Sequence, residues 1–328
     1  MKKILSIIVA VMLITGCMSA CGTDNSTPDT ENGSIQIVTT IFPEYDWVMN
    51  ILGDNTAGAE VTMLLDSGVD LHSFQPTAKD IMKISTCDLF IYVGGESDEW
   101  VDDALREATN EDMIVIDLLD ILGDSAKEEE VVEGMQEEEE EEEEHGEEGP
   151  EYDEHVWLSL RNADVLVGSI SEAIQTIDPD NAETYRANAE AYAEKLRALD
   201  AEYQSMVSEA SLKTMLFGDR FPFRYLAEDY GLDYYAAFVG CSAETEASFE
   251  TITFLAGKVD ELSLPAVITI EGTDHRIAET IVQNTQSKDQ IILTLDSMQA
   301  TTAKDVESGT TYLSIMENNL AVLRDALN

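Results

Sequence analysis

The stretch 181-NAETYRANAEAYAEKLRALDAEYQSMVS-208 predicts one long amphipathic helix, because apolar side chains recur along it at helical spacing. The recurring positions follow one another at alternating steps of four and three: Tyr185, Ala189, Tyr192, Leu196, Leu199, Tyr203 and Met206. At about 1.5 Å per residue this helix would run roughly 40 Å, which is long enough to cross a protein of two lobes. We interpret its Tyr and Met positions as core packing rather than a cofactor site.

Strands and helices alternate on both sides of this helix. Before it, we expect strands over 34–40, 60–65, 88–93 and 113–116, and helices over 45–52, 77–85, 98–108 and 160–177. After it, we expect strands over 213–217, 232–238, 265–270 and 290–295, and helices over 221–230, 248–262, 276–285 and 311–327. Such alternation predicts mostly parallel sheets. The expected fold is α/β, with an N-terminal lobe (35–178) and a C-terminal lobe (210–328) joined by one long rigid helix (179–209).

The N-terminus resembles an export signal. A short basic start precedes the apolar run 4–14, which is too short to span a bilayer and is typical of a signal peptide. Cys17 and Cys21 each follow small residues, as in a bacterial lipobox. We expect residues 1–21 to be a lipoprotein signal peptide with Cys17 lipidated (Cys21 is the alternative), and 22–34 to be a polar tether. The protein is then extracytoplasmic and lipid-anchored to the cell membrane.

The charge is strongly negative, with 67 acidic against 18 basic side chains and a net charge of -49. Such a chain repels phosphates, so we expect no nucleic-acid partner, whereas cations suit it. Seventeen of the acidic residues lie between Glu128 and Glu154. We expect 127–150 to be a disordered surface loop. One hypothesis is that this loop, with His145, collects cations near a binding site; the alternative is a solvated loop without a role.

Two cysteines remain outside the N-terminal segment, Cys87 and Cys241. In an oxidising compartment they can pair as a disulfide. The alternative is that they are two separate buried residues, and the sequence leaves both interpretations open.

The chain has four histidines, and two of them occupy distinctive places. His72 lies in a loop between a predicted strand and a predicted helix, where open α/β sheets bind ligands. His155 directly follows the acidic segment. Imidazole suits zinc and related divalent metals, so this pair favours a metal site.

The runs 68-GVDLHSFQPTAKD-80 and 153-DEHVWLS-159 resemble the two His-ligand motifs of the metal-binding lipoproteins of ABC importers for zinc and manganese. The runs YVGGESDEWVDDAL (92–105) and FPFRYLAEDYGL (221–232) extend the resemblance over nearly the whole chain. It implies two β/α lobes, one metal in the cleft between them, and a monomeric receptor that hands the ion to a membrane permease.

The resemblance also implies particular ligands. It gives His72 and His155 from the N-terminal lobe and Asp296 from the C-terminal lobe. At the position where the family has a third ligand, His or Glu, this chain has Arg220, which offers no lone pair to a metal. We favour His275 as the third nitrogen ligand.

Three further residues stand near the expected site. Asp219 is the alternative ligand, and it would need a shifted backbone. Arg220 is expected to pair with a carboxylate such as Glu271 or Asp219 and so to orient a ligand. Three imidazoles and one carboxylate suit tetrahedral zinc.

The expected function is therefore a zinc-binding receptor of an ABC importer. The alternatives are a manganese receptor of the same family and an adhesin lipoprotein with a structural metal, as in cell adhesion. A zinc hydrolase is less favoured, because the chain has neither HExxH nor GxSxG. We expect no enzymatic activity.

Overall fold

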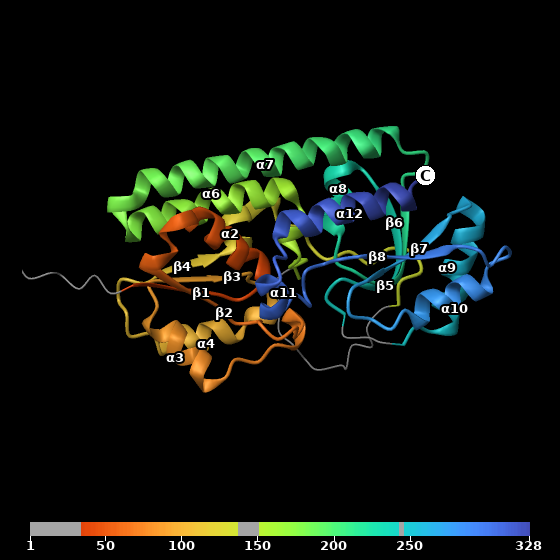
Figure 1. Cartoon of the computed structure of the whole chain (residues 1–328). Helices are drawn as coiled ribbons and strands as arrows, with labels where there is room; N and C mark the ends of the chain where they lie inside the picture. The colour runs from red at the N-terminus through yellow and green to blue at the C-terminus, as the bar shows by residue number, and fades with distance from the viewer. Residues whose placement is uncertain (1–33, 137–150, 243–245) are drawn as a thin grey trace, which may run out of the picture. The chain divides into compact units, whose positions relative to one another are not determined.

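The computed structural model describes residues 34–136, 151–242 and 246–328 (Figure 1). The predicted signal peptide with Cys17 and Cys21, nearly all of the tether, and His145 lie outside the described residues. Within the described ranges, no helix combines the length and apolar character needed to cross a membrane.

The N-terminal lobe is built on a four-stranded parallel sheet with the order β2-β1-β3-β4. Its strands are β1 (Ile35–Thr39), β2 (Ala59–Met63), β3 (Leu89–Tyr92) and β4 (Ile114–Asp117). Its helices are α2 (Phe42–Leu52), α3 (Ala78–Thr86), α4 (Trp100–Arg106), α5 (Leu118–Leu122) and α6 (Leu160–Ile177). Figure 1 shows α3 and α4 on one face of the sheet and α2 and α6 on the other. Both faces are covered, which explains why strands such as β3 are continuously apolar.

The C-terminal lobe repeats this plan with the order β6-β5-β7-β8, again all parallel. Its strands are β5 (Thr214–Phe221), β6 (Asp233–Val239), β7 (Ala266–Ile270) and β8 (Ile291–Leu295). Its helices are α8 (Arg224–Tyr230), α9 (Phe249–Leu262), α10 (Arg276–Asn284), α11 (Ala303–Glu307) and α12 (Tyr312–Ala326).

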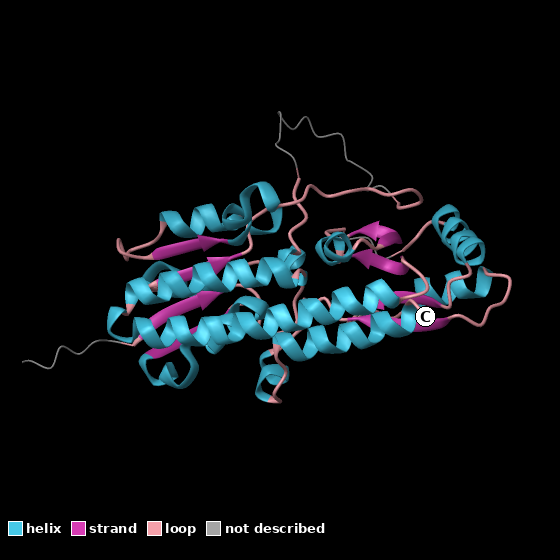
Figure 2. Ribbon diagram, turned by 90° about the horizontal axis from the view of Figure 1, so that it is seen from above, coloured by secondary structure: helices cyan, strands magenta, loops and turns pink. Residues whose placement is uncertain are grey.

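Helix α7 (Ala182–Glu209) runs along both lobes, as Figures 1 and 2 show from two directions. All seven positions of the predicted stripe are buried. Two of its tyrosines form hydrogen bonds to other helices. The Tyr192 hydroxyl donates to Asp46 on α2 at 3.1 Å, and the Tyr203 hydroxyl donates to the Met316 carbonyl on α12 at 2.6 Å.

The predicted fold class is confirmed, and the differences are local. Helices α5 and α11 were not predicted, because five residues are too few to show helical periodicity. Strand β5 extends to Phe221 instead of ending at Phe217, and its pairing with β6 shifts register between Phe217 and Arg220. Helix α8 consequently begins at Arg224.

The start of the acidic segment differs from the predicted disordered loop. Residues 127–136 are ordered and pack against the C-terminal lobe. Gln136 donates its backbone N–H to the Ala237 carbonyl at 2.9 Å, Met135 is buried, and Glu130 pairs with Arg224 at 2.8 Å. The prediction was wrong here because these contacts offset the repulsion between like charges. Residues 137–150, which hold the run of eight Glu, lie outside the described residues.

The disulfide alternative is also wrong in this structure, since Cys87 and Cys241 are both free thiols. The Cys87 Sγ lies 3.5 Å from the Met113 sulfur inside the N-terminal lobe.

Candidate metal centre

His72 lies on a single 3₁₀ turn (Leu71–Ser73) that follows strand β2 and precedes helix α3. Asp70 caps this turn by accepting from the His72 backbone N–H at 3.0 Å. The imidazole Nδ1 faces the Ser97 hydroxyl at 2.7 Å and the Glu154 carboxylate at 3.3 Å. These oxygens fix the ring orientation and leave Nε2 pointing away from them.

His155 is fully buried between the end of the acidic segment and helix α6. One oxygen of Asp153 accepts from both its backbone N–H and its Nδ1, each at 2.9 Å. Burial would lower the pKa of His155, but the carboxylates of Asp153 and Glu154 raise it above its ordinary value. Carboxylate–imidazole pairs of this kind fix the tautomer of metal-binding histidines.

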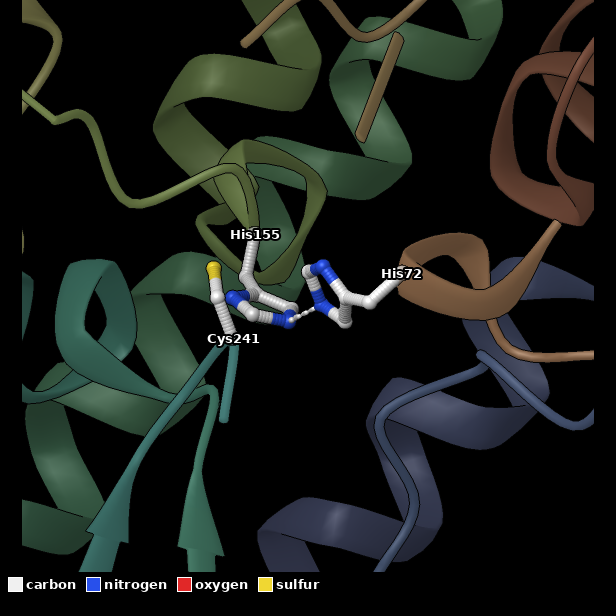
Figure 3. Close-up of side chains that lie close together, drawn as sticks. All are labelled: His72, His155 and Cys241. Carbon is white, nitrogen blue, oxygen red and sulfur yellow. Dashed lines mark hydrogen bonds between the residues drawn. The ribbon is translucent and has the colours of Figure 1, made fainter. Parts of the chain in front are cut away.

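The two Nε2 atoms face each other at 3.2 Å, as Figure 3 shows. With the proton of each ring held at Nδ1 by an oxygen acceptor, both Nε2 atoms direct lone pairs at the same point. Such an arrangement is repulsive unless a cation or a proton lies between the rings. Two nitrogens bound to one tetrahedral zinc at about 2.0–2.1 Å would lie roughly 3.3 Å apart. The separation in the structure is close to that value.

Glu154, the residue before His155, is held by the glycine-rich loop at the end of β3. Its Oε1 accepts from the Ser97 backbone N–H at 2.8 Å. Gly95 has φ 83° and its Cα faces Glu154 so closely that a Cβ would overlap the carboxylate, so only glycine fits there. Burial would raise the pKa of Glu154, but contacts with His72 and Ser97 bring it below its ordinary value.

Cys241 joins the two histidines from the C-terminal lobe. Ligand atoms of His72, His155 and Cys241 lie within 4.8 Å of one another (Figure 3). Burial raises the pKa of the Cys241 thiol, and Asp153, Glu129 and Glu154 raise it further. We did not predict this residue as a ligand. The sequence signal that could have found Cys241 is its position shortly after the predicted strand 232–238, because ligands bind at the edge of the sheet where such strands end.

A cavity of about 830 Å³ reaches these side chains. His72, Ser97, Glu154 and Cys241 form part of its wall. Other wall residues come from the two described ends of the acidic segment, namely Glu129, Val131, Gln136, Glu151 and Tyr152. The route to His72 and Cys241 is therefore lined by carboxylates, which attract cations.

Arg220 lies at the end of β5 and faces the N-terminal lobe. Its guanidinium pairs with Asp70 at 2.6 Å and donates to the Ser242 carbonyl at 3.2 Å. The expected partners were Glu271 or Asp219, and the register shift in β5 explains the difference because it changes the direction of Arg220. Burial would raise the pKa of Asp70, but Arg220 and His72 hold it below its ordinary value.

Asp219 and His275 line a second cavity of about 470 Å³, which they share with Asp70 and Arg220. Asp219 accepts from the Thr273 hydroxyl at 2.9 Å. His275 has a left-handed backbone (φ 57°) just before helix α10. Its Nδ1 is buried and has no hydrogen-bond partner among the described residues.

Asp296 and Glu271 form a separate acidic pair beyond strands β8 and β7. Glu271 accepts from the backbone N–H groups of Ser297 and Gln299 at 2.7 and 3.0 Å. Asp296 accepts from the Met298 N–H at 2.8 Å. Burial raises the pKa of Asp296 to about 6, and the negative charge of Glu271 adds to this increase. In the described part of the chain, neither Asp296 nor His275 is in the group of side chains that converges on His72 and His155.

Comparison with known proteins finds relatives whose names refer to zinc binding or zinc uptake. Residues 37–326 match the family model described as zinc-uptake complex component A, periplasmic. The zinc-binding protein AdcA of Streptococcus pyogenes serotype M3 is 29% identical over 300 residues, which cover 89% of this chain and 56% of AdcA. The chain thus spans little more than half the length of the first curated relatives it matches. The high-affinity zinc uptake system protein ZnuA of Bacillus subtilis is 30% identical over 98% of this chain and 97% of its own length.

A solved structure shares the architecture described above. The Zn(II)-bound ZnuA-like domain of Streptococcus pneumoniae AdcA superposes with a TM-score of 0.69 and 29% identity, covering 90% of this chain and 99% of that domain. The family model spans both lobes and the helix between them. This chain therefore belongs to the family of zinc-uptake complex component A proteins.

Proposed function

We propose that this protein is an extracytoplasmic receptor that binds a zinc ion between its lobes and delivers it to an ABC permease. The observation that carries the proposal is the pair of Nε2 atoms that face each other at 3.2 Å, each on a ring whose Nδ1 is held by an oxygen. His72 and His155 are the proposed ligands from the N-terminal lobe. Asp296 is the proposed carboxylate from the C-terminal lobe.

Zinc is proposed over manganese because of these donor atoms. Imidazole nitrogen suits zinc, whereas manganese prefers carboxylate, carbonyl and water oxygens. A pair of buried imidazoles with converging lone pairs is thus a poorer site for manganese. Manganese remains the competing ion in the test below.

The proposal includes no catalysis, and it places the protein at the outer surface of the cell membrane as a monomer. Support for the lipid anchor comes from the sequence pattern around Cys17. Mass spectrometry of the mature protein from its native membrane tests this part. An acylated N-terminal peptide that begins at Cys17 is expected. A peptide that begins at Cys21 would show that Cys21 is the lipidated residue instead.

The decisive experiment is metal titration of the purified protein in competition with a chromogenic chelator. We expect one zinc per chain and a much weaker response to manganese. The variants His72→Ala and His155→Ala should each lose zinc binding. The matched control His275→Ala should keep it, which shows that the loss is not a general effect of removing an imidazole. A wild-type protein that binds no zinc, or that binds manganese more tightly, would contradict the proposal.

A further inference from the structure

We infer that the Cys241 sulfur is a further ligand of the bound ion, so that the site is two imidazoles, a thiolate and the proposed Asp296 carboxylate. This inference rests on the proposed function and specifies its chemistry. It replaces His275, which we favoured from the sequence, with a residue that lies beside the histidine pair.

The first support is the identity of residue 220. Arg220 lies at the end of β5 and contacts Asp70 of the N-terminal lobe, and its side chain has only N–H donors, so it cannot bind a metal. Its guanidinium is also committed to Asp70 and to the Ser242 carbonyl. A third donor must therefore come from another segment, and the residue beside Ser242 is Cys241.

The second support is the path of the loop after strand β6. Gly240 passes so close to His155 that a Cβ there would lie 3.0 Å from the imidazole Cε1 and 3.0 Å from the Phe221 carbonyl oxygen. A side chain at position 240 would push the loop away. Glycine thus lets the next residue, Cys241, approach the buried histidine.

The third support is the distance between donor atoms. The sulfur and the two imidazoles have ligand atoms within 4.8 Å of one another. A tetrahedral zinc with Zn–S of about 2.3 Å and Zn–N of about 2.0–2.1 Å requires an S···N separation of roughly 3.6 Å. Rotation of the Cys241 side chain about its Cα–Cβ bond, from one staggered position to another, is the movement that brings the sulfur toward the Nε2 pair.

His275 has a different environment. It lines the second cavity, with Asp219 and Arg220, and no atom of it belongs to the group around His155. The carboxylates of Glu129 and Glu154 face the cavity next to Cys241.

Thiolate ligation has a chemical consequence. On binding, the S–H bond of Cys241 breaks, a metal–sulfur bond forms, and the proton passes to solvent. Soft thiolate also increases the preference for zinc over manganese beyond that of two imidazoles.

The test uses cobalt(II) as a spectroscopic substitute for zinc in the purified protein. We expect the wild type and His275→Ala to show a thiolate-to-cobalt charge-transfer band in the near ultraviolet. Cys241→Ser should lack this band and bind zinc at least about 10-fold more weakly, since the loss of even an outer partner of a metal site costs roughly 10- to 100-fold. A wild type that binds cobalt(II) without the band, and a Cys241→Ser variant with unchanged zinc affinity, would overturn the inference while the proposed function stands.

A second measurement needs no variant. Zinc should slow alkylation of Cys241 in the wild type, read separately from Cys87 by peptide mass spectrometry. Equal alkylation of Cys241 with and without saturating zinc would overturn the inference even if Cys241→Ser fails to fold. A wild type that binds no zinc in either assay would instead contradict the proposed function.

Discussion

The two lobes contribute unequal halves to the candidate site. In the N-terminal lobe, His72 and His155 each have Nδ1 held by an oxygen, and both are aimed at one point. In the C-terminal lobe, the polar groups are engaged elsewhere: Arg220 pairs with Asp70, and Asp296 accepts from the Met298 N–H. The N-terminal half is thus preorganised, and the C-terminal half must rearrange. We expect a metal to bind the histidines first.

The largest effect should come from removing an N-terminal donor. His155→Ala should weaken zinc binding by more than about 100-fold, the upper range for losing an outer support. Asp296→Asn should cost less, because the histidine pair still holds the ion. Chelator competition under identical conditions measures both. Equal losses would mean that the halves contribute equally.

The next effect concerns the group that orients His155. Asp153→Asn should weaken zinc binding by roughly 10- to 100-fold, since the amide no longer fixes the tautomer with a charge. The matched control is Asp164→Asn, which removes only a partner of the exposed Arg197. The comparison fails if both variants bind zinc like the wild type.

A third test addresses the attachment of the N-terminal lobe to α7. Burial raises the pKa of Asp46 to about 6, although the Tyr192 hydroxyl lowers it in part. Because the folded pKa lies above the unfolded value of about 3.8, this group favours folding at low pH and loses that contribution as pH rises through 6. Between pH 5 and 8 the loss is about 1.4 kcal/mol on the order-of-magnitude linkage relation.

Asp46→Asn should remove this part of the pH dependence. Urea unfolding of both proteins at pH 5 and pH 8 measures it, and the difference between them isolates Asp46 from the other carboxylates. Parallel pH profiles for the two proteins would show that Asp46 does not titrate in this range.

The smallest effect should come from the contact between the lobes. Arg220→Met removes the ion pair with Asp70, which is partly exposed and so contributes no more than about 1 kcal/mol. We expect zinc affinity to fall by no more than about two- to fivefold, because Asp70 keeps its bond to the His72 backbone N–H. Chelator competition tests this, and a larger loss would contradict it.

The sequence predicted most of the fold because the elements that matter are long and periodic. Helix α7 shows its stripe over 28 residues, and the strands are short apolar runs between turns. Helices α5 and α11 escaped prediction because five residues carry no period. The ordered start of the acidic segment escaped because composition reports charge but not the Arg224 and Ala237 partners that lie far along the chain.

The sequence named His72 and His155, which the structure brings together, but it did not name Cys241 beside them. The two histidines lie in motifs where local sequence sets the ligand and its anchors, as Asp153 and His155 show. The partner of Arg220 is 150 positions away and depends on a register shift in β5, which no local pattern reveals. Cys241 lies in no recognisable ligand motif, so only the close approach of its loop to His155 in the structure identifies it as a candidate ligand.

The ordered part of the acidic segment has a mechanical consequence. The segment 127–136 leaves the N-terminal sheet and is fastened to the C-terminal lobe through Tyr225, Arg224 and Ala237. Helix α7 fastens the same two bodies along another line. Because the two lobes are connected both by this segment and by α7, they have little freedom to separate or twist. They retain mainly a small rotation about the axis that passes through both connections. The proposed release of the ion then requires rearrangement of loops at the site more than opening of the lobes.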